Sequence, residues 1–307
     1  MKLMVLLKDI FARLYLVYGL FALFLVFLWH NPAIMRNAVA QTVSRLTPPI
    51  NYFKLFVEPQ GNYDKDRLKD CIYYHQKVAY FFPFQSPEAN TMLGFCYYRI
   101  NNVARAVEAY QRSLELNPVY FWSYYNLGVI SFKQEKYPEA YMYFRKATEQ
   151  DLVKSMYIIS NSKVYLDVIS SDAKAADAYN PEQSVRRGYG RAYRGVMAAL
   201  FKAERYNELL QFAIKSIADK NDENGVYYHY AGLAAFNLKA FDKAAILFEK
   251  AIELNQQNAD AVLYLGLCLQ AVGRNDIARG YMATASKLHA QYGSFADKYE
   301  NFDVQLF

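Results

Sequence analysis

The side chains best suited to catalysis or metal binding are few in this chain of 307 residues, and they lie far apart. No histidine has a partner at the spacing of a zinc-binding motif, so we expect ordinary packing or interfacial roles for His30, His75, His229 and His289. The sequence also contains no phosphate-binding glycine loop and no serine-nucleophile motif. It therefore predicts a protein that is not an enzyme, holds no metal ion and needs no cofactor.

The three cysteines, Cys71, Cys96 and Cys268, are an odd number and are widely separated. This pattern argues against a disulfide framework and against a zinc site made of four cysteines. Cys96 and Cys268 each stand two residues after a glycine, which indicates small, buried packing residues rather than nucleophiles. Cys71 needs no special role.

The composition indicates a helical chain rich in aromatic residues. Hydrophobic residues make up 54% of it and aromatic residues 17%, with 29 Tyr and 21 Phe but only 13 Gly and 9 Pro. So much apolar surface excludes an intrinsically disordered chain, and so few turn residues argue against many short strands. The formal charge of +6 is modest for a nucleic-acid binder, so we expect no nucleic-acid partner.

Residues 10–29 form an apolar stretch of twenty residues whose only charge is Arg13. A helix of this length matches the hydrocarbon core of a bilayer, about 30 Å thick. Residues 1–30 are therefore predicted to be an uncleaved transmembrane signal anchor. The alternative is a cleaved signal peptide with Ala38-Val39-Ala40 as its cleavage site, but that site lies well beyond the apolar stretch.

The residues on either side of this stretch suggest its orientation. Lys2 and Lys8 precede it, and this small excess of positive charge predicts a cytoplasmic N-terminus. The rest of the chain would then lie outside the cytoplasm, on the periplasmic side of a bacterial inner membrane. Residues 31–65 are interrupted repeatedly by proline and glycine and are predicted to form a juxtamembrane connector.

A period of 34 residues runs through the remainder of the chain. Its glycines follow a leucine or an alanine in Leu93-Gly94, Leu127-Gly128, Ala231-Gly232 and Leu265-Gly266. An alanine follows twelve residues after each glycine, and a large side chain four residues later, at Tyr110, Phe144, Phe248 and Met282. Small residues let two helices approach closely and the large residue fills the gap to the next unit, so the pattern predicts stacked helix pairs.

These offsets resemble those of the tetratricopeptide repeat, a unit of two antiparallel helices. The resemblance implies an all-α fold, a right-handed α-solenoid of helical hairpins over residues 66–292, preceded by one transmembrane helix. Full units are expected at 87–120, 121–154, 225–258 and 259–292, and degenerate units at 66–86, 155–189 and 190–224. Residues 293–307 are expected to form a capping helix and tail, with Phe295, Tyr299 and Phe302 covering the last hairpin.

Tetratricopeptide proteins bind partners on a concave face lined by fixed positions of each first helix, so the resemblance implies a partner-binding groove. Transferred position by position, its residues are Phe95, Tyr98, Arg99, Trp122, Tyr125, Phe132, Lys133, Lys163, Arg191, Arg194, Lys202, His229, Phe236 and Asn237. Trp122 is expected to face this groove rather than the core. Aromatic side chains beside cations suit an extended or helical peptide that carries carboxylates. Alternatively, a segment of the chain itself, such as the loop around residues 170–179, fills part of the groove.

Residues 172–193 are the least regular part of the repeat region and are predicted to hold a basic loop with Arg186 and Arg187. Such a loop could bind an acidic partner or phosphate-bearing headgroups. The alternative is a decayed repeat whose arginines are simply solvated.

The sequence as a whole predicts a non-enzymatic, membrane-anchored scaffold that mediates protein–protein interactions in the assembly of a membrane or envelope complex. Its partners would be peptide segments of other proteins or subunits of that complex, with the membrane reached through the N-terminal helix. One alternative is an accessory subunit of a membrane enzyme complex, for polysaccharide synthesis or cytochrome maturation. Another is a structural protein that assembles with itself as a homo-oligomer.

Overall fold

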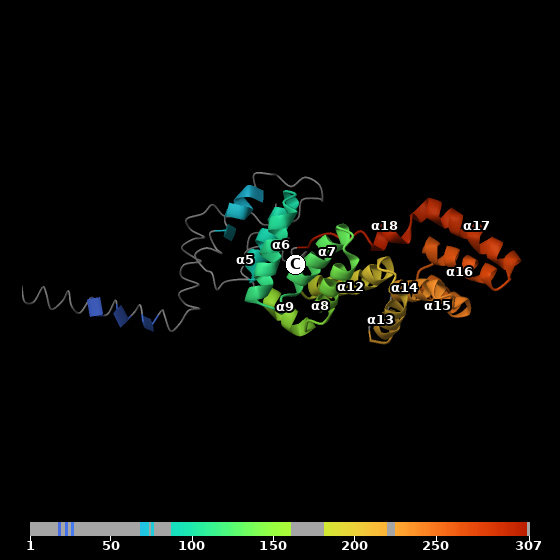
Figure 1. The fold of residues 1–307 in the computed structure, drawn as a ribbon, viewed down its shortest axis with the longest axis horizontal. Helices are drawn as coiled ribbons and strands as arrows, with labels where there is room; N and C mark the ends of the chain where they lie inside the picture. The colour runs from blue at the N-terminus through green and yellow to red at the C-terminus, as the bar shows by residue number, and fades with distance from the viewer. Residues whose placement is uncertain are drawn as a thin grey trace, which may run out of the picture.

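The fold is a stack of α-helices. The computed structural model describes residues 18–19, 22–23, 26–27, 68–73, 75–76, 87–160, 181–219 and 225–305. Regular secondary structure within these ranges is entirely helical, without a strand, as the repeat pattern predicts. The helices form an elongated stack from α5 to α17 (Figure 1).

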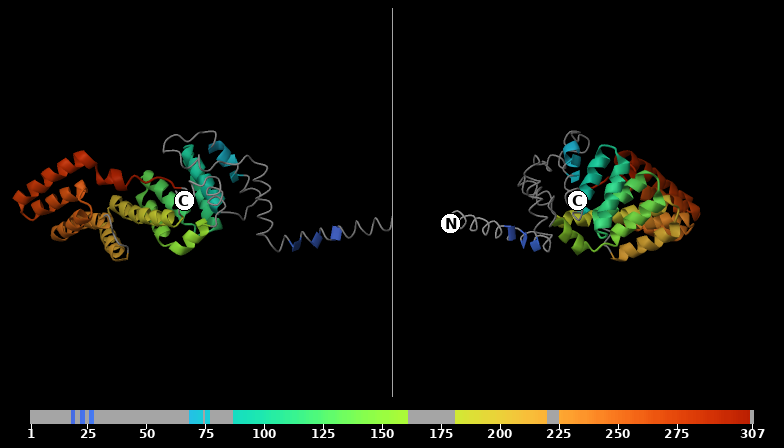
Figure 2. Two further views of the ribbon diagram at one scale, coloured as in Figure 1. Left: turned by 180° about the vertical axis from the view of Figure 1, so that it is seen from behind. Right: turned by 60° about the vertical axis from the view of Figure 1, so that its left-hand side comes forward.

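Successive helices pair into hairpins, and each hairpin packs against the next. The helices are α5 (Pro87–Arg99), α6 (Val103–Leu116), α7 (Phe121–Lys133), α8 (Tyr137–Thr148), α9 (Leu152–Ser160), α12 (Pro181–Lys202), α13 (Tyr206–Asp219), α14 (Val226–Asn237), α15 (Phe241–Leu254), α16 (Ala259–Ala271), α17 (Asn275–Tyr292) and α18 (Phe295–Tyr299). The hairpins are α5–α6, α7–α8, α12–α13, α14–α15 and α16–α17. Figure 2 shows the same stack from two further sides.

The glycines of the repeat stand where two helices touch. A Cβ atom added to Gly94, Gly128 or Gly232 would lie only 2.6–2.7 Å from the ring of the aromatic residue sixteen positions later, Tyr110, Phe144 or Phe248. The fourth unit is looser, because a Cβ at Gly266 would come no closer than 3.2 Å to Met282. The recurring pair of a small and a large residue is therefore the contact that closes each hairpin.

Each first helix ends in the same kind of turn. One residue per turn has a left-handed backbone, at Asn101, Glu135, Glu204, Lys239 and Gly273, with φ between 57° and 84°. The amide that follows bonds to the carbonyl five residues earlier, as in the 2.9 Å bond from Lys136 N–H to Ser131. This is the pattern of a Schellman cap. The repeat of this cap at Glu204 shows that α12–α13 is a hairpin of the same kind.

The pair α12–α13 nevertheless differs from its prediction. Helix α12 begins at Pro181, because proline has the fixed φ that suits a first helical position. It continues without a break to Lys202, across the boundary expected between residues 189 and 190. It also packs directly on α8, while α9 lies against α12, so no hairpin separates α8 from α12 in the described part of the chain. Met197 and Leu209 replace the expected glycine and alanine and are fully buried.

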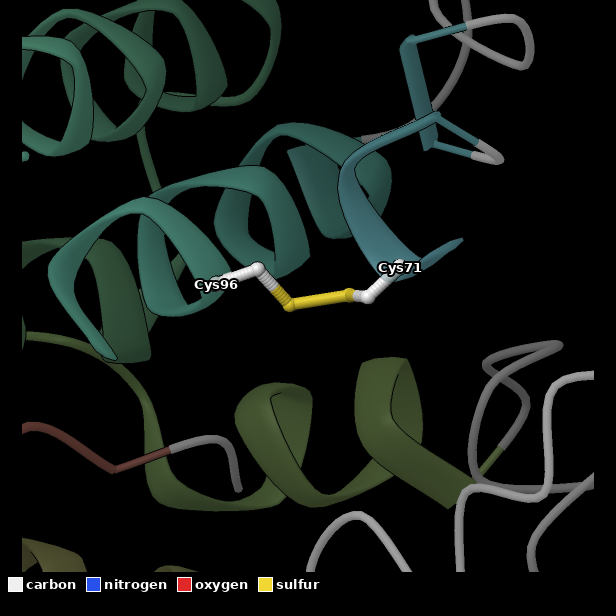
Figure 3. The surroundings of a disulfide bond; sticks show 2 residues. All are labelled: Cys71 and Cys96. Carbon is white, nitrogen blue, oxygen red and sulfur yellow. A yellow bond between two sulfur atoms is a disulfide. The ribbon is translucent and has the colours of Figure 1, made fainter. Parts of the chain in front are cut away.

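A disulfide bond joins Cys71, in the helical residues 68–73, to Cys96 on α5 (Figure 3), with the two Cα atoms 6.6 Å apart. The prediction that Cys96 is a simple packing residue and that Cys71 has no special role was therefore wrong. An odd number of cysteines does not exclude a disulfide, because two of the three can pair and leave one free thiol. That residue is Cys268, which is free and buried as expected, and burial raises the pKa of its thiol to about 11.

The predicted signal anchor and the connector at residues 31–65 lie outside the described residues, apart from three short helical pieces at 18–19, 22–23 and 26–27. Within the described ranges, no helix combines the length and the apolar character needed to cross a membrane.

Candidate functional site

The C-terminal segment, residues 294–305, returns along the molecule from the last hairpin to the first. It leaves α17 at Gly293, forms the short helix α18, and then runs extended past α14 and α12 to α7 and α5 (Figure 1). Phe302 therefore does not cover the last hairpin as predicted. Its ring lies 5.1 Å from that of Phe132 on α7 and 5.5 Å from that of Phe144 on α8, between ring centroids.

Helix α18 docks on α14 and α16 through an aromatic cluster. The ring of Phe295 stacks on that of His229 with centroids 3.8 Å apart and meets Tyr230 edge-on. The Phe295 amide donates a hydrogen bond to a carboxylate oxygen of Asp260. Ser294 caps the helix through a reciprocal pair of hydrogen bonds with Asp297. The local sequence of α18 thus forms a helix of its own, fixed at one end of the segment.

Glu300 follows α18 and meets two groups of the helix stack. The Tyr230 hydroxyl donates a 3.0 Å hydrogen bond to one carboxylate oxygen, and the ammonium of Lys202 lies 3.5 Å from the other. Burial raises the pKa of Tyr230 well above its usual value, and the charge of Glu300 adds to the shift. Tyr230 therefore remains a hydrogen-bond donor to Glu300 at every physiological pH.

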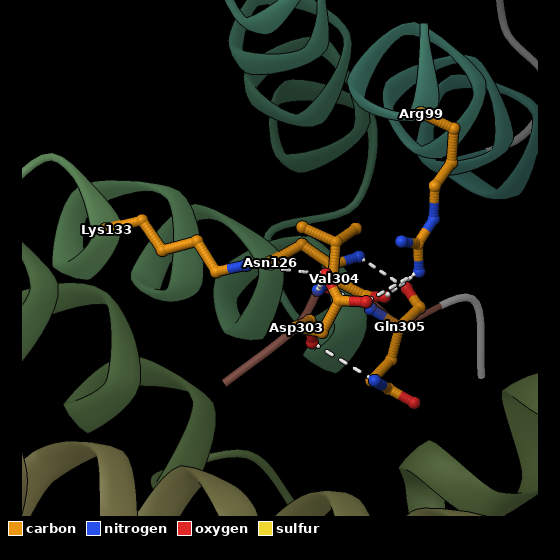
Figure 4. Close-up of polar contacts among 6 residues, drawn as sticks. All are labelled: Arg99, Asn126, Lys133, Asp303, Val304 and Gln305. Atoms are coloured by element: carbon orange, nitrogen blue, oxygen red, sulfur yellow. Dashed lines mark hydrogen bonds and ion pairs between the residues drawn. The ribbon is translucent and has the colours of Figure 1, made fainter. Parts of the chain in front are cut away.

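The last described residues are held through their backbone (Figure 4). The Asn126 side-chain amide donates to the Gln305 carbonyl at 2.7 Å, and its carbonyl oxygen accepts from the Gln305 amide at 2.8 Å. Arg99 donates to the Val304 carbonyl at 3.3 Å and forms an ion pair with Asp303 at 2.9 Å. Lys133 lies 3.7 Å from the other oxygen of Asp303. One carboxylate and three backbone groups are thus bound by three side chains.

Apolar side chains of the segment are buried at the same place. Phe302 keeps 4% of its surface exposed and Val304 only 1%. We call the residues that contact the segment the docking surface: Arg99, Asn126, Phe132, Lys133, Phe144, Arg194, Lys202, His229, Tyr230, Asn255 and Asp260. Most of them lie on the first helices of four hairpins and on α16.

Several predicted groove residues are brought together on this surface. They are Arg99, Phe132, Lys133, Arg194, Lys202 and His229, with the Arg194 guanidinium 5.8 Å from the ring centroid of Tyr299. Phe95 and Tyr98 lie beside the cations of the surface. The Arg99 guanidinium sits 4.9 Å from the Phe95 ring centroid, and the Lys133 ammonium sits 5.8 Å from that of Tyr98.

Trp122 and Tyr125 belong to the core, so the expectation that Trp122 faces the groove is wrong. Trp122 is 2% exposed and packs edge-on against Phe121 and Tyr125, and a Cβ at Gly188 would lie 2.6 Å from its ring. Tyr125 is 1% exposed, and burial raises its pKa to about 12. The cause is the long helix α12, which covers this face of α7.

The remaining groove candidates lie away from the segment or outside the described residues. Arg191 is half-buried, and its charge partly offsets the raised pKa of Tyr125. Phe236 packs edge-on against Phe241 and Tyr264. Asn237 is exposed and donates to the carbonyl of Leu233 in its own helix. Lys163 falls in the part of the chain that the structure does not describe.

The expected basic loop is helical. Arg186 and Arg187 lie on α12, are exposed, and bond to Glu182 and Gln183 one turn earlier. Such exposed pairs within one helix are typical of a solvated face.

The sequence interpretation missed Asn126, whose side chain is buried and grips the segment's backbone. The signal was an amide in helix α7, where most residues are aromatic or aliphatic and a buried polar group needs hydrogen-bonding partners. The prediction also did not identify Glu300 and Asp303 as the matching acids, because they lie more than 65 residues from their partners. Among the described residues, no three His, Cys, Asp or Glu side chains are grouped to hold a metal ion.

Comparison with known proteins identifies the repeats. Models of the TPR, or tetratricopeptide, repeat match residues 94–135, 123–152, 225–258 and 247–280. The solved structure of YrrB, described as a TPR protein with an unusual peptide-binding site, is 17% identical with a TM-score of 0.50, over 71% of this chain and 93% of YrrB. That of PilF from Pseudomonas aeruginosa is 14% identical with a TM-score of 0.49, over 87% of this chain and 97% of PilF.

In sequence, the chain is 19% identical over 256 residues to the CTR9 homolog of Arabidopsis thaliana. The match covers 79% of this chain but spans only 23% of that protein. The repeat models show that this chain contains tetratricopeptide repeats, and the shared fold shows that it is an all-α solenoid.

Proposed function

We propose that this chain is a non-enzymatic scaffold that binds an extended, acidic segment of a partner protein on its docking surface. The observation that carries the proposal is the way this surface holds residues 302–305. Backbone groups of an extended strand are bound by Asn126 and Arg99, while a carboxylate is bound by Arg99 and Lys133. These are the contacts by which a protein recognises an extended peptide with carboxylates.

The charge of the surface favours an acidic partner. Arg99, Lys133 and Lys202 each meet a carboxylate of the segment, and Arg194 lies over its Tyr299 ring. These cations come from α5, α7 and α12, so they form a row that a partner segment would follow across three hairpins. Tetratricopeptide repeats are generally scaffolds for protein–protein interaction, which agrees with this assignment.

We further propose that residues 1–30 anchor the scaffold in a membrane and that the repeats lie outside the cytoplasm. The apolar stretch at residues 10–29 supports the anchor. The disulfide between Cys71 and Cys96 supports the location, because such bonds persist in oxidising compartments and are rare in the cytosol. A scaffold placed there would hold partner proteins during assembly of a membrane or envelope complex.

The binding proposal is tested by pull-down of the full chain in mild detergent, with partners identified by mass spectrometry. Charge reversal of the docking surface in Lys133→Glu/Lys202→Glu is expected to abolish capture of a specific partner. The matched control is Arg186→Glu/Arg187→Glu, which reverses two charges on the exposed face of α12. Capture that survives the first variant and is lost in the second would place the binding site on the exposed face around Arg186 and Arg187, away from the docking surface.

The location is tested separately, by extracting membranes with alkaline carbonate and by treating intact spheroplasts with protease. An anchored, extracytoplasmic scaffold stays in the membrane pellet and is cleaved from outside. Release by carbonate would contradict the anchor, and protection of the repeats in intact spheroplasts would contradict the orientation.

A further inference from the structure

Residues 300–305 differ from the rest of the chain in how they join the fold. They follow α18 without helix or strand, and their contacts are with helices that lie far away in sequence. Gln305 bonds to Asn126 across 179 residues, and Val304 to Arg99 across 205 residues. The hairpins at Gly94, Gly128 and Gly232 close through glycine and aromatic contacts between their own two helices. The segment adds one contact to these pairs, that of Phe302 with the ring of Phe144. The glycine contacts that close each hairpin are therefore made by the helices, and the strand is added to the stack through Phe302 and Val304.

The strand itself is bound as a peptide ligand would be. Asn126 forms a two-point contact with the backbone of Gln305, which any residue type except proline could make at that position. Sequence preference comes from three neighbouring side chains. Phe302 packs against Phe132 and Phe144, Asp303 meets Arg99 and Lys133, and Val304 is buried. The surface thus selects an aromatic residue, a carboxylate and an aliphatic residue in that order.

The two halves of the segment are held in different ways. Helix α18 has its own capping box and stacks Phe295 on His229, so it forms a fixed attachment beside the docking surface. The strand beyond Glu300 has no secondary structure and depends on the docking surface alone. A short tether of this kind keeps the strand at an effective concentration on the order of millimolar.

We propose that residues 300–305 are an intramolecular ligand that occupies the docking surface, and that a partner displaces them with a segment of the same aromatic–carboxylate–aliphatic order. This inference rests on the proposed function, because it names the partner's chemistry at the same surface. It adds a regulatory consequence. A partner binds only the fraction of molecules whose strand has detached, so its apparent affinity is lowered by that fraction.

The test uses the full chain in detergent and a fluorescent peptide with the sequence of residues 294–305. The variant Phe302→Ala/Asp303→Ala weakens the resident strand but leaves the docking surface intact. We expect this variant to bind the peptide at least tenfold more tightly than the wild type, as measured by fluorescence anisotropy. Lys298→Ala, an exposed change on α18, is the matched control and should bind as the wild type does.

A third variant shows where the peptide binds. Adding Asn126→Ala to Phe302→Ala/Asp303→Ala removes the backbone contact, so the tenfold gain should disappear. If the gain persists, the peptide binds elsewhere and the proposal is overturned. If the tail variant binds no more tightly than the wild type, the strand does not occupy the surface competitively, and the proposal is overturned as well.

A measurement on the unmodified chain guards against a variant that simply fails to fold. Hydrogen exchange should show the Gln305 amide opening much faster than the amides in the middle of α7, because a displaceable strand opens without the helix stack. Equal protection of the two would show that the strand is a permanent part of the fold. Equal protection would overturn only the proposal that the strand is displaced. The proposal that the docking surface binds a partner is tested separately, by whether Lys133→Glu/Lys202→Glu abolishes capture in the pull-down.

Discussion

The core between the hairpins and the docking surface are built from the same helices, yet they differ in how local their contacts are. In the core, Gly128 meets Phe144 sixteen residues later, and the arrangement recurs at Gly94 and Gly232. On the docking surface, Asn126 meets Gln305 across 179 residues, and nothing in the repeat dictates that contact. The comparison teaches that the repeat determines the stack, whereas the repeat does not determine what occupies its inner surface.

The largest effect is expected for Trp122, and it tests whether this residue belongs to the core or to the docking surface. Trp122→Ala should lower the free energy of unfolding by about 3–5 kcal/mol, because it removes a large side chain that is 2% exposed. Urea unfolding followed by circular dichroism measures the change. Lys133→Ala, an exposed change on the docking surface, should cost less than about 1 kcal/mol. A Trp122→Ala variant that keeps its stability but binds peptide poorly would place this residue on the docking surface after all.

The disulfide offers a second way to perturb the core without touching the docking surface. Replacing both partners in Cys71→Ser/Cys96→Ser should lower the free energy of unfolding by about 3 kcal/mol, as expected for a bridge that closes a loop of 25 residues. Reductant should destabilise the wild type by a similar amount and leave the double variant unchanged. Equal stability of the wild type with and without reductant would show that the bridge carries no such role. Cys268 is buried and free in both proteins, so it does not alter the comparison.

Adding one methyl group at a glycine tests how closely two helices of the core approach each other. Gly128→Ala should destabilise the protein by about 1–3 kcal/mol, since the new Cβ would lie 2.7 Å from the Phe144 ring. Gly190→Ala on α12 is the matched control, because no atom lies within 4 Å of its Cβ position. Alanine there should be neutral or stabilise the helix by up to about 1 kcal/mol. Thermal melting of both variants measures the difference, and equal effects would contradict the close approach of α7 and α8.

The repeat and its helices were predictable because they depend on contacts within one unit. The spacing of Gly94 and Tyr110 predicts a hairpin from a few residues, and the structure contains that hairpin. Helix α12 was not predictable in the same way. Its first half resembles no repeat, and it packs on α8 where a Cβ atom at Gly195 would lie only 2.7 Å from the Phe144 ring. The disulfide was missed because an odd number of cysteines says nothing about which two meet.

The site was predictable in its cations and aromatic residues but not in its occupant. Arg99, Lys133 and Lys202 were identified by their positions in the repeat, and all three face carboxylates. Their partners, Glu300 and Asp303, were left unidentified because the path of the strand depends on tertiary contacts. Trp122 was misplaced for a related reason, since only the packed structure shows that α12 covers its face of α7.

The smallest effect is expected for His229, which contacts both the core and the C-terminal segment. Its ring stacks on Phe295 of the C-terminal segment and also meets Phe248 of the core. Burial lowers the pKa of His229 to about 3, and the same holds for His75. Each histidine takes up a proton near pH 6.5 when the chain unfolds but stays neutral in the fold. Stability therefore falls as the pH drops below about 6.5, by about 1.4 kcal/mol per histidine between pH 7.5 and 5.5.

Replacing this ring in His229→Gln removes one of the two titrating groups, so the fall in stability between these pH values should be about 1.4 kcal/mol smaller than in the wild type. Urea unfolding at both pH values measures the difference, and the matched control is His289→Gln, which changes an exposed histidine. An unchanged pH dependence in His229→Gln would mean that the ring is solvated in the folded chain. Phe295 would then have no stable contact with His229, and α18 would depend on its other contacts, among them those of Phe295 with Tyr230 and Asp260.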